Sequence, residues 1–242
     1  MATQFFNPIV VGIAGGSGSG KTYVAQRIQQ RLGPASCLLL DSDAYYRDLS
    51  HLTPDQRAVF DFDVPGAIEW GLYHRHVHAL RAGQSIDKPR YDFSTHTRRP
   101  GSEWVHSRPV ILLEGILVLA EEQVRECMDY RVFVDTPADL RLARRIERDI
   151  RERGRTAESV LMQYSATVRP AHEAFVEPSR RFAHVTIPSE DPQSVANAVD
   201  FIVAGLSSRK QRYIPNQVRS VPQFAGVLRT PRMWTDRTWF GM

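Results

Sequence analysis

A glycine-rich loop near the start of the chain carries its most specific chemical signal. Residues 15–22 read GGSGSGKT and fit the pattern G-x-x-x-x-G-K-[ST], in which backbone amides surround phosphate oxygens. In this pattern the lysine holds the β- and γ-phosphates of a nucleoside triphosphate, and the next hydroxyl ligates Mg²⁺. The residues predicted to bind nucleotide here are Gly15, Gly16, Ser17, Gly18, Ser19, Gly20, Lys21 and Thr22. A glycine-rich turn without a ligand is the alternative.

Three carboxylates follow apolar segments that have the pattern of buried strands. Asp41 and Asp43 come after residues 36–40, and Glu114 ends the run 110–114. Ligands of parallel sheets bind at the carboxyl ends of strands, so these acids are candidates for a base or for a partner of Mg²⁺. We expect Glu114 near Mg²⁺, because a charge that ends an apolar run needs a partner. Capping of a strand end remains open for Asp41 and for Asp43, since Asp is common in turns.

The polar segment 85–108 mixes aromatic rings with hydroxyls and a histidine. Its prolines exclude a central strand. Tyr91, Phe93 and His96 have side chains that can stack on a planar base and form hydrogen bonds with it. The segment is therefore a candidate binding site for a nucleoside base, and an ordinary surface hairpin is the alternative.

An arginine-rich segment covers residues 141–155, with seven arginines against three acids. The helical spacing places Leu142, Ile146 and Ile150 in one stripe and arginines on another face. Guanidinium groups bind phosphate oxygens in a bidentate manner, which favours a lid over phosphates. A solvated, charged helix face is the alternative.

Apolar runs alternate with helical patterns along the first 206 residues. Strands are expected at 9–13, 36–40, 110–114, 131–135 and 182–188. Helices are expected after the glycine loop as far as residue 32, at 54–83 with interruptions and there most clearly at 68–83, and at 116–128, 138–153, 158–168 and 195–206. Pro170 is expected to end the helix at 158–168. The alternation predicts an α/β fold: a parallel sheet of the P-loop NTPase type flanked by helices, with a small β-hairpin insertion and an arginine-rich lid helix.

The composition narrows the class of protein. Two cysteines indicate neither a disulfide framework nor a zinc site, which fits a cytoplasmic protein. The apolar runs are too short to cross a membrane, and no signal-peptide pattern is present. The net charge of +4 is concentrated in the segment 207–242, whose seven basic residues and one acid give +6. Residues 1–206 therefore carry −2, which does not favour binding of nucleic acid.

The ordered motifs resemble the uridine kinase (uridine–cytidine kinase) family of P-loop nucleoside kinases, from about residue 8 to residue 188. The segments that carry the resemblance are 15–22, 43–46, 62–65, 91–93, 96–98, 114–117, 144–149, 153–155 and 169–170. The sequence departs from the family pattern at Ala44, Gly66, His184 and 189–191. The domains expected are a kinase domain at 1–206, with an insertion at about 85–108 and a lid at about 141–165, and a basic, aromatic tail at 207–242.

The resemblance implies phosphorylation of the 5′-hydroxyl of uridine and cytidine to UMP and CMP in pyrimidine salvage, with ATP or GTP as donor and Mg²⁺ as cofactor. It also implies a homo-oligomer, commonly a tetramer, that is inhibited by UTP and CTP. Asp43 matches the catalytic base, assisted by Lys21. The positions that hold the ribose in the family are matched by Asp63, Arg145 and Gln163. Those that read the pyrimidine edge are matched by Tyr91 and His96, with Phe62 and Phe93 around the base. Those that contact the phosphates are matched by Arg148, Arg153 and Arg155.

Three other interpretations stay open at this point. The chain could be a related P-loop kinase of a different small acceptor, similar to phosphoribulokinase or to pantothenate kinase. A module that senses nucleotides without turnover is a third class, although such a module would not need a base at Asp43. The tail at 207–242 holds five aromatic residues among its arginines and is expected to dock on this protein or on a partner.

Overall fold

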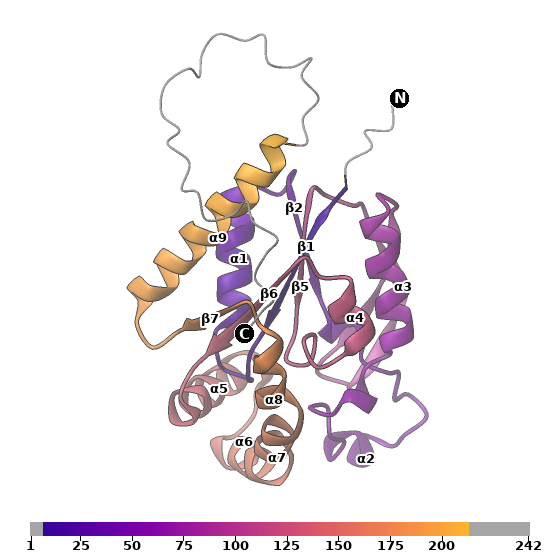
Figure 1. Ribbon diagram of the computed structural model, residues 1–242. Helices are drawn as coiled ribbons and strands as arrows, with labels where there is room; N and C mark the ends of the chain where they lie inside the picture. Colours follow the sequence, from indigo (N-terminus) through magenta and orange to yellow (C-terminus); the bar gives the residue numbers. More distant parts are fainter. Residues whose placement is uncertain (1–6, 213–242) are drawn as a thin grey trace.

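The computed structural model describes residues 7–212 and has a parallel sheet at its centre (Figure 1). Its strands lie in the order β2-β5-β1-β6-β7, and each neighbouring pair is parallel. Their bounds are β1 Ile9–Ala14, β2 Cys37–Asp41, β5 Val110–Glu114, β6 Tyr130–Asp135 and β7 Val185–Pro188. The expected α/β fold with a parallel sheet is confirmed.

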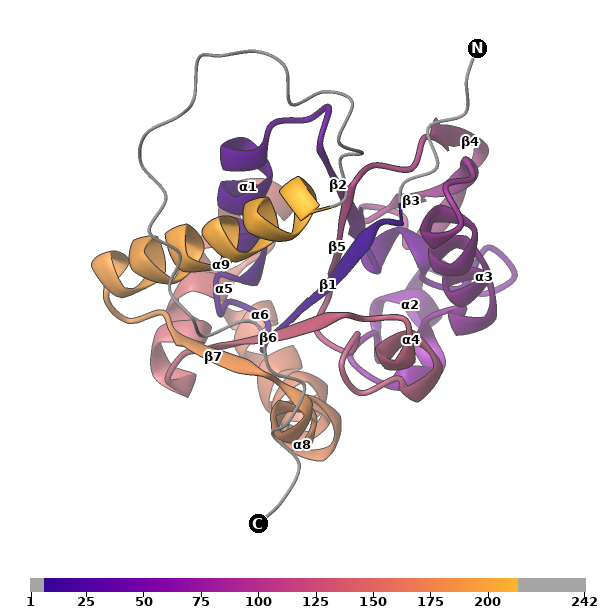
Figure 2. The ribbon, with the colours of Figure 1, turned by 45° about the horizontal axis from the view of Figure 1, so that its top comes forward.

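Helices cover both faces of this sheet (Figure 2). On one face lie α1 (Lys21–Leu32) and α9 (Pro192–Arg212), which pack on Val11 and Ile13 of β1. On the other face lie α3 (Trp70–Arg81) and α4 (Glu122–Glu126), against Val10 and Ala14. Because successive strand residues point to opposite faces, β1 contributes to both apolar cores and is buried on both sides.

The expected hairpin insertion is a separate antiparallel pair, β3 (Ile86–Asp92) and β4 (Thr97–Val105). Lys88 in β3 joins it to the end of β2 through an ion pair with Asp41 (Nζ to Oδ2, 2.6 Å). Arg98 in β4 donates to the carbonyl of Tyr46 at 3.0 Å and pairs with Glu69 at 2.8 Å. Two tethers thus hold the hairpin over the segment that follows β2.

Helix α5 (Ala138–Arg153) buries its arginine face rather than its apolar stripe. Arg141, Arg145 and Asp149 are buried, whereas Ile150 of the stripe is 47% exposed. The reason is its position, since α5 lies beyond the carboxyl ends of the strands and does not pack on the sheet (Figure 1). Its inward face covers the phosphate loop, and charged side chains suit that position better than apolar ones.

The helical segment that begins with α6 (Ala157–Gln163) does not end before Pro170, as the sequence suggested. Wide π-type turns at 164–168 and 172–176 alternate with α7 (Arg169–Ala171) and α8 (Glu177–Ser179), and the run reaches residue 182. A proline ring clashes with the carbonyl four residues before it. Each wide turn ends two residues before a proline, Pro170 or Pro178, where it relieves that clash.

Three expected helix boundaries also differ. The helix expected at 68–83 is α3, which begins at Trp70, because Ile68 pairs with Tyr46 in an isolated bridge. The segment 116–128 contains only α4, whereas the interrupted helical segment expected at 54–83 holds α3 and, before it, the short helix α2 (Pro54–Ala58). Helix α9 continues across the expected domain boundary at residue 206, as far as Arg212, and the rest of the tail lies outside the described residues. Between residues 7 and 212, no helix has the length and apolarity needed to traverse a lipid bilayer.

Candidate functional site

A cavity of about 760 Å³ lies between the phosphate loop, the hairpin, α5 and α6. The predicted residues of the acceptor side line it together: Asp43, Phe62, Asp63, Tyr91, Phe93, His96, Arg145 and Gln163. The predicted residues of the phosphate side that line it are Ser17, Lys21, Arg148, Arg153 and Arg155. Residues from six separate segments of the chain therefore meet at one site.

The phosphate loop runs from β1 into α1, whose first residue is Lys21. Gly18 has a φ of 81°, and a Cβ built there would lie 2.2 Å from the carbonyl oxygen of Arg141. A side chain at this position is therefore excluded by backbone conformation and by space. The helix N-terminus and the loop amides together favour an anion in front of the loop.

Lys21, Thr22 and Glu114 meet at the edge of the loop. The Thr22 hydroxyl donates to Glu114 Oε1 at 3.1 Å, and Lys21 Nζ lies 3.5 Å from the same oxygen. Burial raises the pKa of Glu114; Lys21 opposes this effect, and the carboxylate of Asp43 adds to it. Glu114 and the remaining loop residues stand next to the cavity, outside its lining.

These groups fit a magnesium ion. Glu114 and Asp43 share one ammonium group, Lys21, so the pair leaves room for a further positive charge. Mg²⁺ uses one or two carboxylates and takes its other ligands from phosphates and water. In keeping with this, no cluster of three His, Cys, Asp or Glu side chains within residues 7–212 could hold a metal by itself.

The two acids after β2 have different surroundings. Asp41 accepts a hydrogen bond from the backbone amide of Ala44 at 3.0 Å, as expected for a residue that caps the end of a strand. It also forms the ion pair with Lys88. Asp43 is half-buried and lines the cavity. Burial raises the pKa of Asp43, Lys21 lowers it, and the charge of Asp41 raises it further. Of these two acids, Asp43 lines the cavity and Asp41 does not.

Aromatic side chains form the acceptor end of the cavity. Phe62 and His96 are stacked, with ring centroids 4.8 Å apart, and Tyr46 meets Phe62 edge to face at 5.3 Å. Tyr91 packs against Phe93 at 5.4 Å, and its buried hydroxyl has no hydrogen-bond partner among residues 7–212. Burial, followed by Arg153 and Arg155, lowers the pKa of His96, which keeps the ring neutral. A neutral ring offers one donor and one acceptor.

Arg145 connects the two ends of the cavity. It donates to Ser17 Oγ of the phosphate loop at 2.7 Å and to Gln163 Oε1 of α6 at 3.0 Å. Asp63 lies opposite and is buried; burial raises its pKa, while Arg145 lowers it. Asp63, Arg145 and Gln163, the residues predicted to hold the ribose, thus share one cavity lining.

Several residues of the site were missed from the sequence. Tyr46 and Phe60 line the aromatic end, and Asp149 lies buried among the lid arginines. Asp149 has a signal that could have revealed it, because an acid at i, i+4 from two arginines pairs with both. Ser189, one of the departures from the family pattern, donates to the carbonyl of Ser19 at 2.7 Å and so touches the phosphate loop.

The comparisons with known proteins agree on one family. Residues 10–196 match the model of the Phosphoribulokinase / Uridine kinase family. A uridine kinase of Chloroflexus aggregans is 50% identical over 206 residues, which are 85% of this chain and 98% of that protein. A uridine kinase of Brevibacillus brevis is 47% identical over 190 residues, 78% of this chain and 89% of that protein.

Solved structures share the fold at low sequence identity. A putative fructose transport system kinase from Silicibacter sp. TM1040 has a TM-score of 0.61 at 19% identity and covers 78% of this chain and 93% of its own. Phosphoribulokinase from Rhodobacter spheroides has a TM-score of 0.53 at 16% identity, with 77% and 74% covered. Given the family match over most of the sequence, this chain is a kinase that belongs to the phosphoribulokinase/uridine kinase family.

Proposed function

We propose that this kinase transfers the γ-phosphate of ATP or GTP to the 5′-hydroxyl of uridine and of cytidine. The observation that carries the proposal is the shared cavity, whose lining includes Asp43, the lysine of the phosphate loop and the aromatic side chains. A sugar phosphate or a pantothenate-like acceptor offers no planar base for such rings. The names of the relatives support the same substrate class.

The donor side of the cavity binds phosphates through charge. Lys21 neutralises the β- and γ-phosphates, and the arginines of α5 approach the transferred group. We propose that Thr22 and Glu114 hold Mg²⁺, Glu114 directly or through water. Bound there, Mg²⁺ supplies charge neutralisation at the phosphate oxygens.

The acceptor side orients the nucleoside. Asp63, Arg145 and Gln163 hold the ribose hydroxyls, while Tyr91 and His96 form hydrogen bonds with the edge of the pyrimidine. Phe62 and Phe93 pack around the base. Since a neutral His96 can donate to a keto oxygen or accept from an amino group, both uracil and cytosine are accommodated.

Asp43 then acts on the 5′-hydroxyl. It accepts a hydrogen bond from the hydroxyl, aims the oxygen at the phosphorus and takes the proton as the new bond forms, an effect worth about 10²–10⁴-fold in rate. The arginines of the lid exclude water, which would otherwise compete as an acceptor.

The cellular setting is part of the proposal. We place the enzyme in the cytoplasm and in pyrimidine salvage, with feedback by UTP and CTP and assembly into a homo-oligomer, in line with the family resemblance. Both cysteines are free and buried, which agrees with a reducing compartment. The partner of the tail is left open.

A panel of acceptors tests the substrate. The protein is assayed with ATP and with GTP against uridine, cytidine, ribulose 5-phosphate and pantothenate. Formation of UMP and CMP is expected, with neither of the other acceptors used. Transfer to another acceptor by well-folded protein, with neither nucleoside used, would contradict the proposal. Activity on cytidine alone would contradict the role given to His96.

A further inference from the structure

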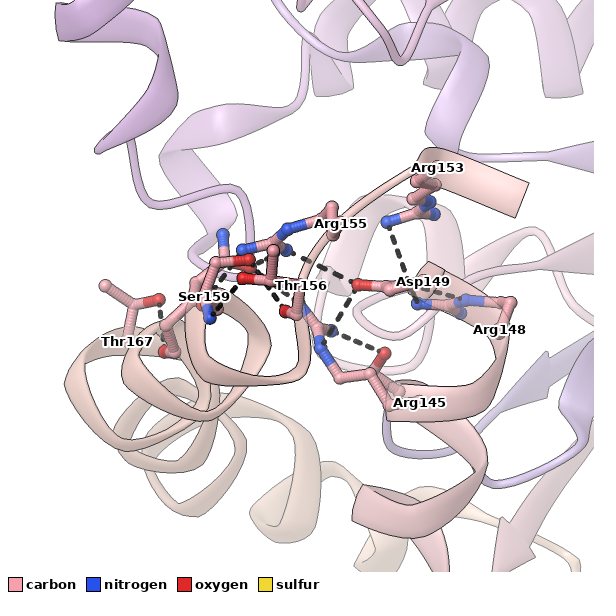
Figure 3. A network of polar contacts seen from close by, with 10 residues as sticks. Arg145, Arg148, Asp149, Arg153, Arg155, Thr156, Ser159 and Thr167 are labelled. Carbon is pink, nitrogen blue, oxygen red and sulfur yellow. Dashed lines mark hydrogen bonds and ion pairs between the residues drawn. The ribbon is translucent and has the colours of Figure 1, made fainter. Parts of the chain in front are cut away.

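One fully buried carboxylate, Asp149, lies among the arginines that line the phosphate side of the cavity. It is located near the C-terminal end of α5, and its side chain is 0% exposed. Figure 3 shows arginines around it, contributed by α5 and by the segment that follows. These are Arg145, Arg148, Arg153 and Arg155, and each of them lines the cavity.

The two oxygens of Asp149 divide the arginines between them. Oδ1 accepts from Arg148 at 2.7 Å and lies 3.6 Å from Arg153. Oδ2 lies 3.4 Å from Arg155 and 3.8 Å from Arg145. The backbone carbonyl of Asp149 also accepts a hydrogen bond from the amide of Arg155 at 3.1 Å. The main chain and the side chain of Asp149 therefore order the same turn.

This arrangement resembles the one that a phosphate group demands. A guanidinium binds a carboxylate and a phosphate with the same geometry, through N–H donors directed at two oxygens. Four cations around one anion leave a surplus of three positive charges facing the cavity. Burial would raise the pKa of Asp149, but Arg148 and the other arginines outweigh it and hold the pKa below its ordinary value. The carboxylate is therefore ionised whenever the enzyme works.

We propose that Asp149 is a positioning residue: an internal counter-anion that holds the four arginines in phosphate-binding orientation before the nucleotide arrives. The inference rests on the proposed function, since it names what orders the arginines of that same site. Arginines kept in place by a fixed charge need little reorganisation at the moment of transfer. The same charge also competes with phosphate for their donors.

Loss of the Asp149 charge should change phosphate affinity and transfer rate in opposite directions. Removing the charge in Asp149→Asn frees the arginines and strengthens the positive field, so a polyphosphate should bind more tightly. It also removes their fixed orientation, so transfer should become slower. A residue needed only for folding would weaken binding and turnover together.

The test compares Asp149→Asn with Glu147→Gln in the full-length chain. Glu147 is on the same helix, its side chain is 76% exposed, and it pairs with Arg151, which does not line the cavity. Calorimetric titration with inorganic tripolyphosphate should show about three- to tenfold tighter binding for Asp149→Asn, since one nearby negative charge is lost. In steady-state assays with uridine, kcat should fall at least about tenfold, whereas Glu147→Gln should match the wild type in both measurements.

Weaker tripolyphosphate binding by folded Asp149→Asn, or an unchanged kcat, would overturn the proposal. If this variant does not fold, Asp149→Ser takes its place with the same two expectations, and failure of both to fold would assign Asp149 to folding alone. Titration with tripolyphosphate needs no nucleoside. A wild type that phosphorylates neither uridine nor cytidine therefore counts against the proposed function only, and kcat is then measured with the acceptor that is used.

Discussion

The phosphate end and the aromatic end of the cavity are built on different principles. The phosphate end consists of backbone amides, Lys21 and arginines arranged around charge, and its organising contacts are ion pairs. The aromatic end consists of rings in contact at about 5 Å, some of them on a hairpin that two tethers attach to the domain. In the proposed function, the phosphate end binds the nucleotide phosphates and the aromatic end recognises the shape and the edge of a base.

This difference predicts which kinetic constant a substitution at each end should change. Changes at the phosphate end should alter kcat, because charge develops there during transfer. Changes at the aromatic end should alter the KM of the nucleoside and leave the donor's KM unchanged. Asp43 lies where the two ends meet, so it should show the largest effect on rate.

Replacement of Asp43, the proposed catalytic base, is the strongest test of this division between the two ends of the cavity. In Asp43→Asn the side chain keeps its shape but cannot take a proton, so we expect kcat to fall by about 10²–10⁴-fold. Binding of ATP, followed by calorimetry, should be retained, because Lys21 and the arginines are untouched.

Asp41→Asn is the matched control, since Asp41 lies two residues away and pairs with Lys88 outside the cavity lining. It should lower kcat far less than Asp43→Asn does. If Asp43→Asn retains turnover and Asp41→Asn loses it, the catalytic base is Asp41 and not Asp43.

At the aromatic end, His96→Ala should act on the nucleoside alone. It removes the stack on Phe62 and a hydrogen bond to the base, which together are worth about 1.5–3 kcal/mol. We expect kcat/KM for uridine and cytidine to fall about 10- to 100-fold, with the donor's KM unchanged in steady-state assays.

His106→Ala is its control. His106 is on the same hairpin, contacts Ser85 and Trp104, and does not line the cavity. Equal losses in the two variants would mean that the hairpin as a whole, and not the ring of His96, accounts for the effect.

The two ends also differ in how far the sequence predicts them. The phosphate loop is contiguous, and its glycines, lysine and hydroxyl at fixed spacing specify the strand–loop–helix unit that the structure contains. The aromatic end comes from three separate segments. Tyr91 and His96 were predicted from their residue types and from the family resemblance, but Tyr46 and Phe60 join them only through tertiary contacts.

Helix α5 and the segment after it were the least predictable. The stripe of Leu142, Ile146 and Ile150 is typical of a helix that packs on a core, yet the arginine face is the buried one. Pro170 is a strong stop signal, and the π-type turns that carry the helix through it leave no mark in the local sequence. The excess of arginine in this helix did indicate a charged partner, but local patterns cannot report that the charged face is buried more deeply than the apolar stripe.

The pH dependence of the wild type gives a third prediction. The raised pKa of Asp43 means that the base becomes protonated at a pH above its ordinary range. Since only the ionised form accepts the proton, kcat should rise with pH, by about tenfold per unit below this pKa, and then level off. An acid limb that persists unchanged in Asp43→Asn would assign the titration to another group.

The smallest expected effect concerns the tether of the hairpin. Lys88→Met removes the ion pair with Asp41 but keeps the length of the side chain, and the pair is only partly buried, so we expect a loss of about 1 kcal/mol. The KM for uridine should therefore rise about three- to fivefold, because the hairpin is held less firmly, while the donor's KM stays constant. The variant also leaves the charge of Asp41 unpaired near Asp43, which should move the acid limb of kcat to a slightly higher pH. If Lys88→Met raises the KM of the donor as much as that of uridine, the two ends of the cavity are mechanically coupled, and the division of labour between them does not hold.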